Sequence, residues 1–112
     1  MNNSETRFKQ LMSVSDPSIV KLNLKKYLGS TYDLYISDKL NKKYCIFDIS
    51  TNQFIHFGDL RYQDFTKHHD MERRERYLRR ALNLKGDWKN NKKSPNNLAI
   101  NLLWAYDSKK MN

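Results

Sequence analysis

The stretch between residues 31 and 58, TYDLYISDKLNKKYCIFDISTNQFIHFG, constrains the fold of this chain more than any other feature. Its apolar side chains recur at every second position, as at Tyr32, Leu34 and Ile36. A period of two is typical of strands with one buried face. The polar segments SDKLNKK and STNQ separate three such runs, and Gly58 follows the last. We therefore predict a three-stranded antiparallel meander that ends at Gly58.

A sheet of three strands needs a helix packed on one face to be stable. Asp70 suits the N-cap of a helix that runs to about Leu82, and Glu72 in its first turn complements the helix dipole. The pair Ser94-Pro95 begins a second, short helix that should be largely buried. The fold class that we predict is α+β: a small three-stranded antiparallel sheet with a basic helix packed on it and a short C-terminal helix.

The length of 112 residues is enough for one domain and too short for two. Residues 1–15 are polar and predict a flexible N-terminal tail, and residues 107–112 predict a C-terminal tail. We predict that residues 16–106 form the single α+β domain. It opens with a short helix after Asp16-Pro17, which Gly29 ends.

The single Cys45 has no partner for an internal disulfide, which is typical of a reducing compartment. No apolar run approaches the roughly 20 residues of a membrane span, and the first residues are polar. We predict a protein that is neither secreted nor membrane-spanning.

The formal charge of +9 is concentrated in residues 67–112, which hold twelve basic and five acidic side chains. Such asymmetry favours a polyanionic partner. Arginines gather on one side of the predicted 70–82 helix, and a lysine-rich loop follows it. The candidate nucleic-acid-binding residues are Arg73, Arg76, Arg79, Arg80, Lys85, Trp88, Lys89, Lys92 and Lys93. No helix-turn-helix, zinc-finger or RNP sequence is present, so we expect no sequence specificity.

The corner between sheet and helix carries a second group of polar residues. Arg74 projects into the apolar side of the helix and needs a carboxylate partner, for which Asp70 and Asp64 are the candidates. We predict that His56, Asp64 and Asp70 position Arg74 and that the corner does no chemistry. The predicted structural corner comprises His56, Gly58, Tyr62, Asp64, Thr66, His68, Asp70 and Arg74.

The histidines and carboxylates of this corner are also the residue types of acid–base or metal sites. No nucleophile stands at a recognisable spacing, and the adjacent His68 and His69 do not match zinc-ligand spacing. We therefore predict no catalytic residue, no metal and no cofactor. A metal-dependent nuclease built on Asp64, His68 and Asp70 is kept as an alternative.

A series of motifs spans residues 35–104. It runs KKY at 42–44, HFG at 56–58, Y-x-D-F-T-x-H-x-D at 62–70, R-R-x-x-Y-L-x-R at 73–80, SPNNL at 94–98 and LLW at 102–104. The series resembles a family of small basic proteins of unknown function from large double-stranded DNA viruses of eukaryotes. The resemblance implies a viral origin, one shared fold, and a location in the virion or the infected host cell. It implies no biochemical activity.

Two partner classes fit these observations. The first hypothesis is a non-enzymatic viral protein that binds DNA or RNA through the arginine-rich helix and the lysine-rich loop. The alternative is a virion component, such as a minor capsid or cementing protein, that binds the acidic surface of viral proteins, because aromatic and arginine side chains are favoured at interfaces.

Overall fold

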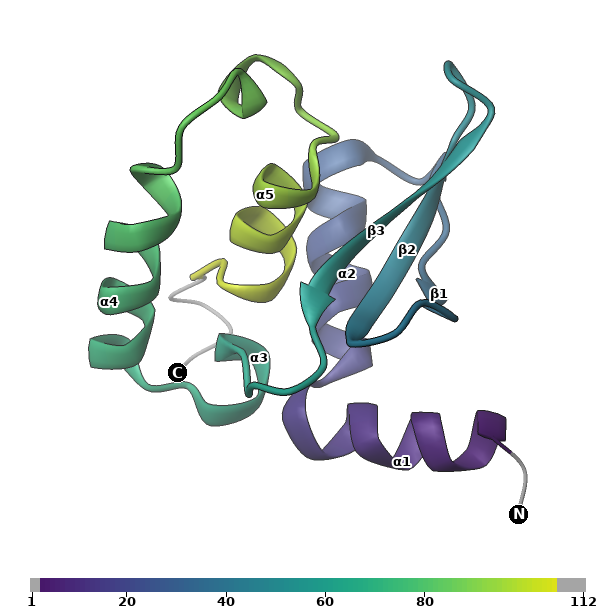
Figure 1. The fold of residues 1–112 in the computed structure, drawn as a ribbon, viewed down its shortest axis with the longest axis vertical. Helices are drawn as coiled ribbons and strands as arrows, with labels where there is room; N and C mark the ends of the chain where they lie inside the picture. Colours follow the sequence, from purple (N-terminus) through teal and green to yellow (C-terminus); the bar gives the residue numbers. More distant parts are fainter. Residues whose placement is uncertain (1–2, 107–112) are drawn as a thin grey trace.

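The computed structural model describes residues 3–106 (Figure 1), so the C-terminal tail predicted at 107–112 lies outside the described residues. Three antiparallel strands and several helices confirm the predicted α+β class. The elements in chain order are α1 (Asn3–Val14), α2 (Pro17–Leu28), β1 (Tyr35–Ile36), β2 (Lys42–Asp48), β3 (Gln53–Asp59), α3 (Phe65–His68), α4 (Met71–Leu82), η1 (Trp88–Asn90), α5 (Pro95–Leu98) and η2 (Ala99–Leu103).

The sheet is the predicted meander, with the order β1-β2-β3 and antiparallel pairing throughout. Tyr44 pairs with Phe57 and Ile46 with Ile55, so these four side chains share one face of the sheet. Tyr44, Ile46 and Phe57 are fully buried there. The strand β3 extends one residue beyond Gly58, which was predicted to end it.

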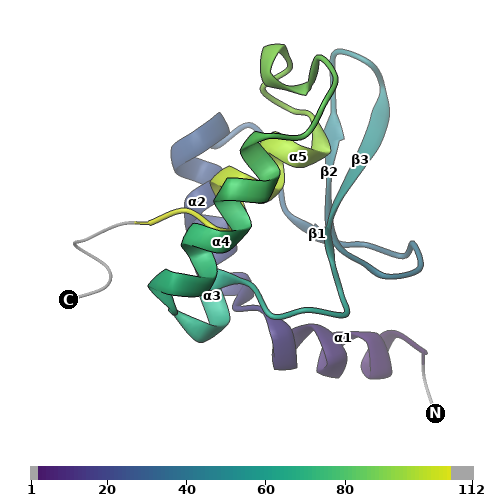
Figure 2. The same cartoon turned by 60° about the vertical axis from the view of Figure 1, so that its left-hand side comes forward.

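One face of the sheet is covered by a helical layer (Figure 2). The helix α5 and its π-helical continuation η2 pack on β3, and α2 packs on η2. The side-chain amide of Asn23 in α2 donates to the carbonyl of Leu102 at 2.8 Å, which ties the two helices together. Helix α4, which was predicted to pack on the sheet, lies instead on the outer side of α5, where Tyr77 stacks on Trp104 with ring centroids 4.2 Å apart.

The predicted caps of α4 and α5 are present, and a further cap at Asp16 begins α2. Asp16 accepts from the backbone of Ser18 at the start of α2, and Asp70 accepts from the backbone of Glu72 and Arg73 at the start of α4. The hydroxyl of Ser94 does the same for α5. These caps satisfy backbone donors that the first turn of a helix leaves free.

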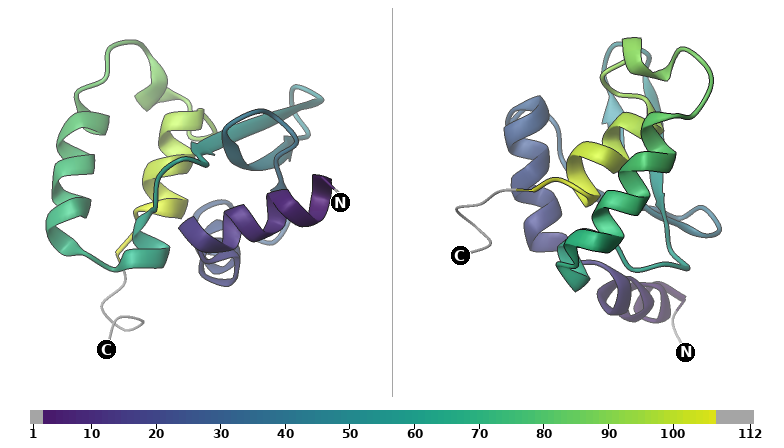
Figure 3. Two further views of the ribbon diagram at one scale, coloured as in Figure 1. Left: turned by 60° about the horizontal axis from the view of Figure 1, so that its bottom comes forward. Right: turned by 90° about the vertical axis from the view of Figure 1, so that its left-hand side faces the viewer.

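The predicted N-terminal tail is wrong for residues 3–14, which form α1. Leu11 is fully buried in the main core, and the guanidinium of Arg7 donates to the carbonyls of Ser37 and Lys39 at 3.0 and 2.9 Å. Figure 3 shows α1 running from the corner toward the turn between β1 and β2. The sequence conceals this helix because one buried leucine and one bridging arginine hold an otherwise polar segment. The domain therefore begins before residue 16.

Candidate functional site

A buried ion pair lies in the corner between sheet and helices. The Nζ of Lys43 and the Oδ2 of Asp64 are 3.0 Å apart, with side chains 3% and 1% exposed. Burial lowers the pKa of Lys43, and the Asp64 carboxylate opposes that shift. Asp64 also accepts from the backbone and hydroxyl of Thr66, and this hydroxyl accepts from the backbone N–H of Asp16 at 2.9 Å. The network joins β2, the corner and the start of α2.

The prediction that a carboxylate partners Arg74 is wrong. Its Nε donates to the carbonyl of Trp104 at 2.6 Å, and its guanidinium lies 5.7 Å and 5.8 Å from the ring centroids of Phe65 and Tyr106. No carboxylate between residues 3 and 106 forms an ion pair with it. Asp64 is unavailable because Lys43 occupies it. A helix-end carbonyl and two aromatic faces therefore stabilise this cation.

The other corner residues do not converge on one point. His56 shares a 2.7 Å hydrogen bond with the hydroxyl of Ser37, while Asp70 caps α4. The Nδ1 of His68 accepts from the backbone of Asp70 at 2.9 Å. Within the described chain, no group of three His, Cys, Asp or Glu side chains could hold a metal ion. Asp64, His68 and Asp70 thus do not assemble the ligand set that a metal-dependent nuclease would require.

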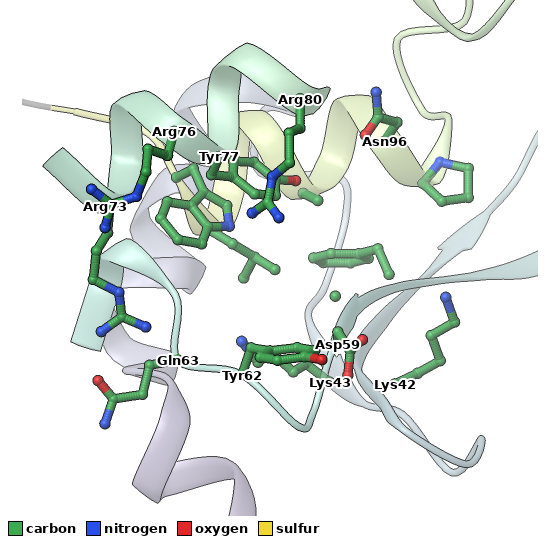
Figure 4. Close-up of a pocket in the computed structure, with 16 residues that line it drawn as sticks. Lys42, Lys43, Asp59, Tyr62, Gln63, Arg73, Arg76, Tyr77, Arg80 and Asn96 are labelled. Atoms are coloured by element: carbon green, nitrogen blue, oxygen red, sulfur yellow. The ribbon is translucent and has the colours of Figure 1, made fainter. Parts of the chain in front are cut away.

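A cleft of about 530 Å³ opens between α4 on one side and β2 and β3 on the other (Figure 4). We call it the basic cleft. Its lining residues are Lys42, Lys43, Phe57, Gly58, Asp59, Tyr62, Gln63, Arg73, Arg76, Tyr77, Arg80, Pro95, Asn96, Ala99, Leu103 and Trp104. Five sequence segments contribute to it, so it exists only in the folded chain.

The arginines reach the basic cleft because of their spacing along α4. Arg73, Arg76 and Arg80 stand at intervals of three and four residues, which places them on one side of a helix. Tyr77 on that same side anchors α4 by stacking on Trp104. Burial raises the pKa of Tyr77 to about 12, so its hydroxyl is neutral at physiological pH. Figure 4 shows Arg80 pointing from α4 into the cleft and Arg73 extending toward Gln63.

The floor of the basic cleft is apolar and depends on Gly58. This residue has a φ of +84°, in a region that side chains disfavour. A Cβ atom built at this position would lie 2.8 Å from Cδ1 of Leu103. Glycine therefore allows η2 to approach the sheet closely, so that Phe57, Leu103 and Trp104 form a continuous floor.

The charges around the basic cleft do not cancel. No described carboxylate forms an ion pair with Lys42, Arg73, Arg76 or Arg80. The one acid in its lining, Asp59, is itself paired with Arg61 at 2.9 Å, and this pairing lowers the pKa of the carboxyl. An apolar floor under a cationic rim can bind a ligand that has both an anionic group and a flat apolar part.

The lysines of the loop after α4 do not line the basic cleft, and three of them contact side chains of the folded chain. Lys93 lies 2.6 Å from the Oδ1 of Asp48 and also donates to Tyr32. The Nζ of Lys92 is 4.9 Å from the ring centroid of Tyr27, and that of Lys89 is 5.5 Å from the ring centroid of Trp88. Lys93 and Lys92 thereby join the loop to β2 and α2, whereas the contact of Lys89 stays within the loop.

The remaining residues of the predicted nucleic-acid-binding set also lie outside the cleft lining. The indole of Trp88 donates to the carbonyl of Leu84 at 2.8 Å, which makes Trp88 a loop anchor. Arg79 is exposed and lies 3.5 Å from Glu75, and Lys85 is exposed. Of the nine predicted residues, only Arg73, Arg76 and Arg80 line the basic cleft.

Sequence reasoning missed Lys42 as a cleft residue and Lys43 as the buried cation. The signal was present in the strand pattern, because adjacent strand residues point to opposite faces. Two consecutive lysines in a buried strand therefore require one of them to turn inward and find an acid. Tyr62 was assigned to the corner, yet it is 63% exposed and lines the cleft.

Comparison with known proteins gives one similarity. None of the described helices is long and apolar enough to cross a membrane. No curated protein and no solved structure matches the chain. Over residues 32–81, from just before β1 to the last turn of α4, the chain is similar to a family of unknown function (DUF5754).

Proposed function

We propose that this protein binds nucleic acid without sequence specificity, through the basic cleft and the arginines of α4, and that it does no catalysis. The observation that carries the proposal is the convergence of Lys42, Arg73, Arg76 and Arg80 on one cleft, without an ion pair to any carboxylate in the described chain. Guanidinium groups on a rigid helix suit phosphate oxygens because each can donate two parallel hydrogen bonds.

The strength of this binding should depend steeply on salt. Each phosphate that a cation neutralises releases counterions, so affinity falls as salt rises. With about four such contacts to a single strand, the logarithm of the binding constant should fall with the logarithm of salt with a slope of about −3. A slope near zero would contradict a binding mode built on these four cations.

The direct test is fluorescence anisotropy with a labelled oligonucleotide of mixed sequence at low salt. Replacing Arg73, Arg76 and Arg80 together by alanine should weaken binding roughly 1,000-fold, because each lost phosphate contact costs about tenfold at 50 mM salt. Alanine retains helix propensity, so α4 should persist. Circular dichroism and thermal unfolding would check this.

A matched control removes the same charge elsewhere. Lys9, Lys21 and Lys25 are exposed on α1 and α2 and line no part of the basic cleft. Their triple alanine variant should lose much less affinity than the arginine variant. Equal losses would show that net charge alone drives binding, and no binding by the parent protein at low salt would refute the proposal.

A second candidate is a virion component that binds other viral proteins, given the viral origin that the resemblance implies. The observation that favours it is an aromatic cluster on the sheet face opposite the core. Phe54 lies 6.0 Å from Tyr35 and 5.1 Å from Phe47 between ring centroids, and both Phe54 and Tyr35 are exposed. Quantitative mass spectrometry of purified virions tests this: a fixed copy number supports it, and presence in infected cells alone contradicts it.

A further inference from the structure

We propose that the basic cleft takes one nucleotide of a single strand, with its base inside the cleft and its phosphates on the α4 arginines. The protein would then prefer single-stranded to double-stranded nucleic acid. This inference rests on the proposed function and adds the form of the nucleic acid that is bound.

The first argument is the division of chemistry within the cleft. Its α4 wall carries the three guanidinium groups of Arg73, Arg76 and Arg80, while its floor is apolar. A nucleotide has the same division, since its phosphate is anionic and its base presents flat apolar faces. The volume of about 530 Å³ falls in the range of pockets for small organic ligands.

The second argument concerns Tyr62, which stands across the cleft from α4 (Figure 4). Its ring is 63% exposed although it is a large aromatic side chain. The guanidinium of Arg61 lies 5.8 Å from its ring centroid and is fixed by two hydrogen bonds to Asp59, at 3.0 and 2.9 Å. An aromatic ring presented beside cations is the arrangement on which unpaired bases stack.

The third argument is access. A base within a duplex is already stacked and paired, so the basic cleft can receive it only after the base leaves the duplex. A duplex would therefore contact the outer arginines of α4 and leave the floor of the cleft unused. A single strand can place a base against Tyr62 and keep its phosphates on Arg73, Arg76 and Arg80.

The polar side chains at the two ends of the cleft fit this ligand. Gln63 lies at the end near Arg73, and Asn96 lies at the end near Arg80 (Figure 4). The amide of Asn96 donates to the carbonyl of Ala81 at 3.0 Å, which fixes its orientation. Amides can donate to or accept from the edge of any base, so they need not select a sequence.

The test compares one labelled 15-residue oligonucleotide with its duplex under the same salt. The parent protein should bind the single strand at least tenfold more tightly. Replacing Tyr62 by alanine should weaken single-strand binding about 5- to 100-fold through lost stacking, with duplex binding changed less than twofold. Tyr62→Phe should restore it. Tyr35→Ala removes an exposed ring on the other sheet face and should change neither affinity.

A second variant blocks the cleft without changing its charge. Gln63→Trp places a bulky side chain at the end near Arg73 and should reduce single-strand affinity to that of the duplex. Thermal unfolding of each variant separates a blocked cleft from a damaged fold. Single-strand affinity unchanged in both Tyr62→Ala and Gln63→Trp would overturn the inference.

Tryptophan fluorescence can report occupation of the cleft, which charge-driven binding elsewhere on the surface would not change. The chain has two tryptophans, and Trp88→Phe leaves only Trp104, which lines the cleft. Single strands should quench its emission, and duplexes should not. If both forms bind equally and neither quenches, the protein binds nucleic acid but not by this cleft. If neither form binds at low salt, the proposed function itself fails.

Discussion

Two neighbouring basic regions of this molecule differ in what lies beside their charges. The arginines of α4 that face the basic cleft have no acidic partner among the described residues. In the loop that follows, Lys93 is bound to Asp48, and Lys92 and Lys89 lie against aromatic rings. The two regions look alike in sequence. Whether a cation is paired within the fold or left without an acidic partner is decided by what the tertiary fold places beside it.

The corner adds the extreme case of a cation used for folding. Both Lys42 and Lys43 line the basic cleft, but Lys43 is buried and paired with Asp64, whereas Lys42 is exposed and has no acidic partner among the described residues. Substitutions that separate stability from the proposed nucleic-acid binding can therefore test the comparison, residue by residue.

The largest effect should come from Asp64→Asn, which leaves Lys43 buried without a counter-ion. Breaking a buried ion pair costs about 3–5 kcal/mol of unfolding free energy. Urea denaturation followed by circular dichroism would measure it. Asp59→Asn is the control, because its pair with Arg61 is exposed and should contribute about 0–1 kcal/mol. Similar losses in both variants would show that the buried pair of Lys43 and Asp64 contributes no more to stability than the exposed pair does.

The next prediction is that one substitution in each basic region separates stability from nucleic-acid affinity. Lys93→Met should cost about 1.5–3 kcal/mol of stability, since it removes the charged hydrogen bond to the buried Asp48, and should leave nucleic-acid affinity within about twofold. Arg80→Met should do the reverse, with stability nearly unchanged and affinity reduced about tenfold at low salt. Denaturation and anisotropy on both variants test this. If Lys93→Met weakens binding as much as Arg80→Met does, the proposed difference between the loop lysines and the cleft arginines is wrong.

The same pair predicts a dependence of stability on acid. The hydrogen bond from Lys93 lowers the pKa of Asp48 to about 2, below the value of about 3.9 in an unfolded chain. A carboxyl with a lowered folded pKa stabilises the protein above its unfolded pKa and loses that effect as pH falls through the folded one. The stability difference between the parent and Lys93→Met should therefore shrink between about pH 4 and pH 2. A constant difference would contradict it.

The strands and the main helices could be predicted because their causes are local. Alternation of side chains marks β2, and short-range caps at Asp16, Asp70 and Ser94 mark the helix starts. Such signals depend on residues within a few positions of one another. The helix α1 was missed because its stability comes from distant contacts, namely the burial of Leu11 and the bonds of Arg7 to the β1–β2 turn.

The ion pairs could not be predicted for the same reason. Lys43 and Asp64 are 21 residues apart, and the carbonyl that Arg74 contacts is 30 residues away. The sequence showed that Arg74 lies on the apolar side of its helix. It did not show that a helix-end carbonyl would replace a carboxylate. The basic cleft is even less accessible to prediction from short-range signals, since its lining comes from five segments.

A smaller effect is expected at Arg74. Arg74→Met should cost about 1 kcal/mol, through the hydrogen bond to Trp104 and the contacts with Phe65 and Tyr106. The loss stays small because no buried anion is left behind. Urea denaturation of this variant beside Asp64→Asn measures the contrast. A loss of about 3 kcal/mol or more would indicate a carboxylate partner for Arg74 after all.

The smallest effect on stability should come from Arg79→Ala, and it gives the sharpest test of position against charge. Arg79 pairs with Glu75 on the exposed side of α4, an interaction that contributes about 0.3–0.5 kcal/mol. Its neighbour Arg80 carries the same charge but points into the cleft. Arg80→Ala should therefore weaken nucleic-acid binding several-fold more than Arg79→Ala at the same salt. Equal losses would mean that the ligand responds to the total charge of α4, and the cleft would then have no part in binding.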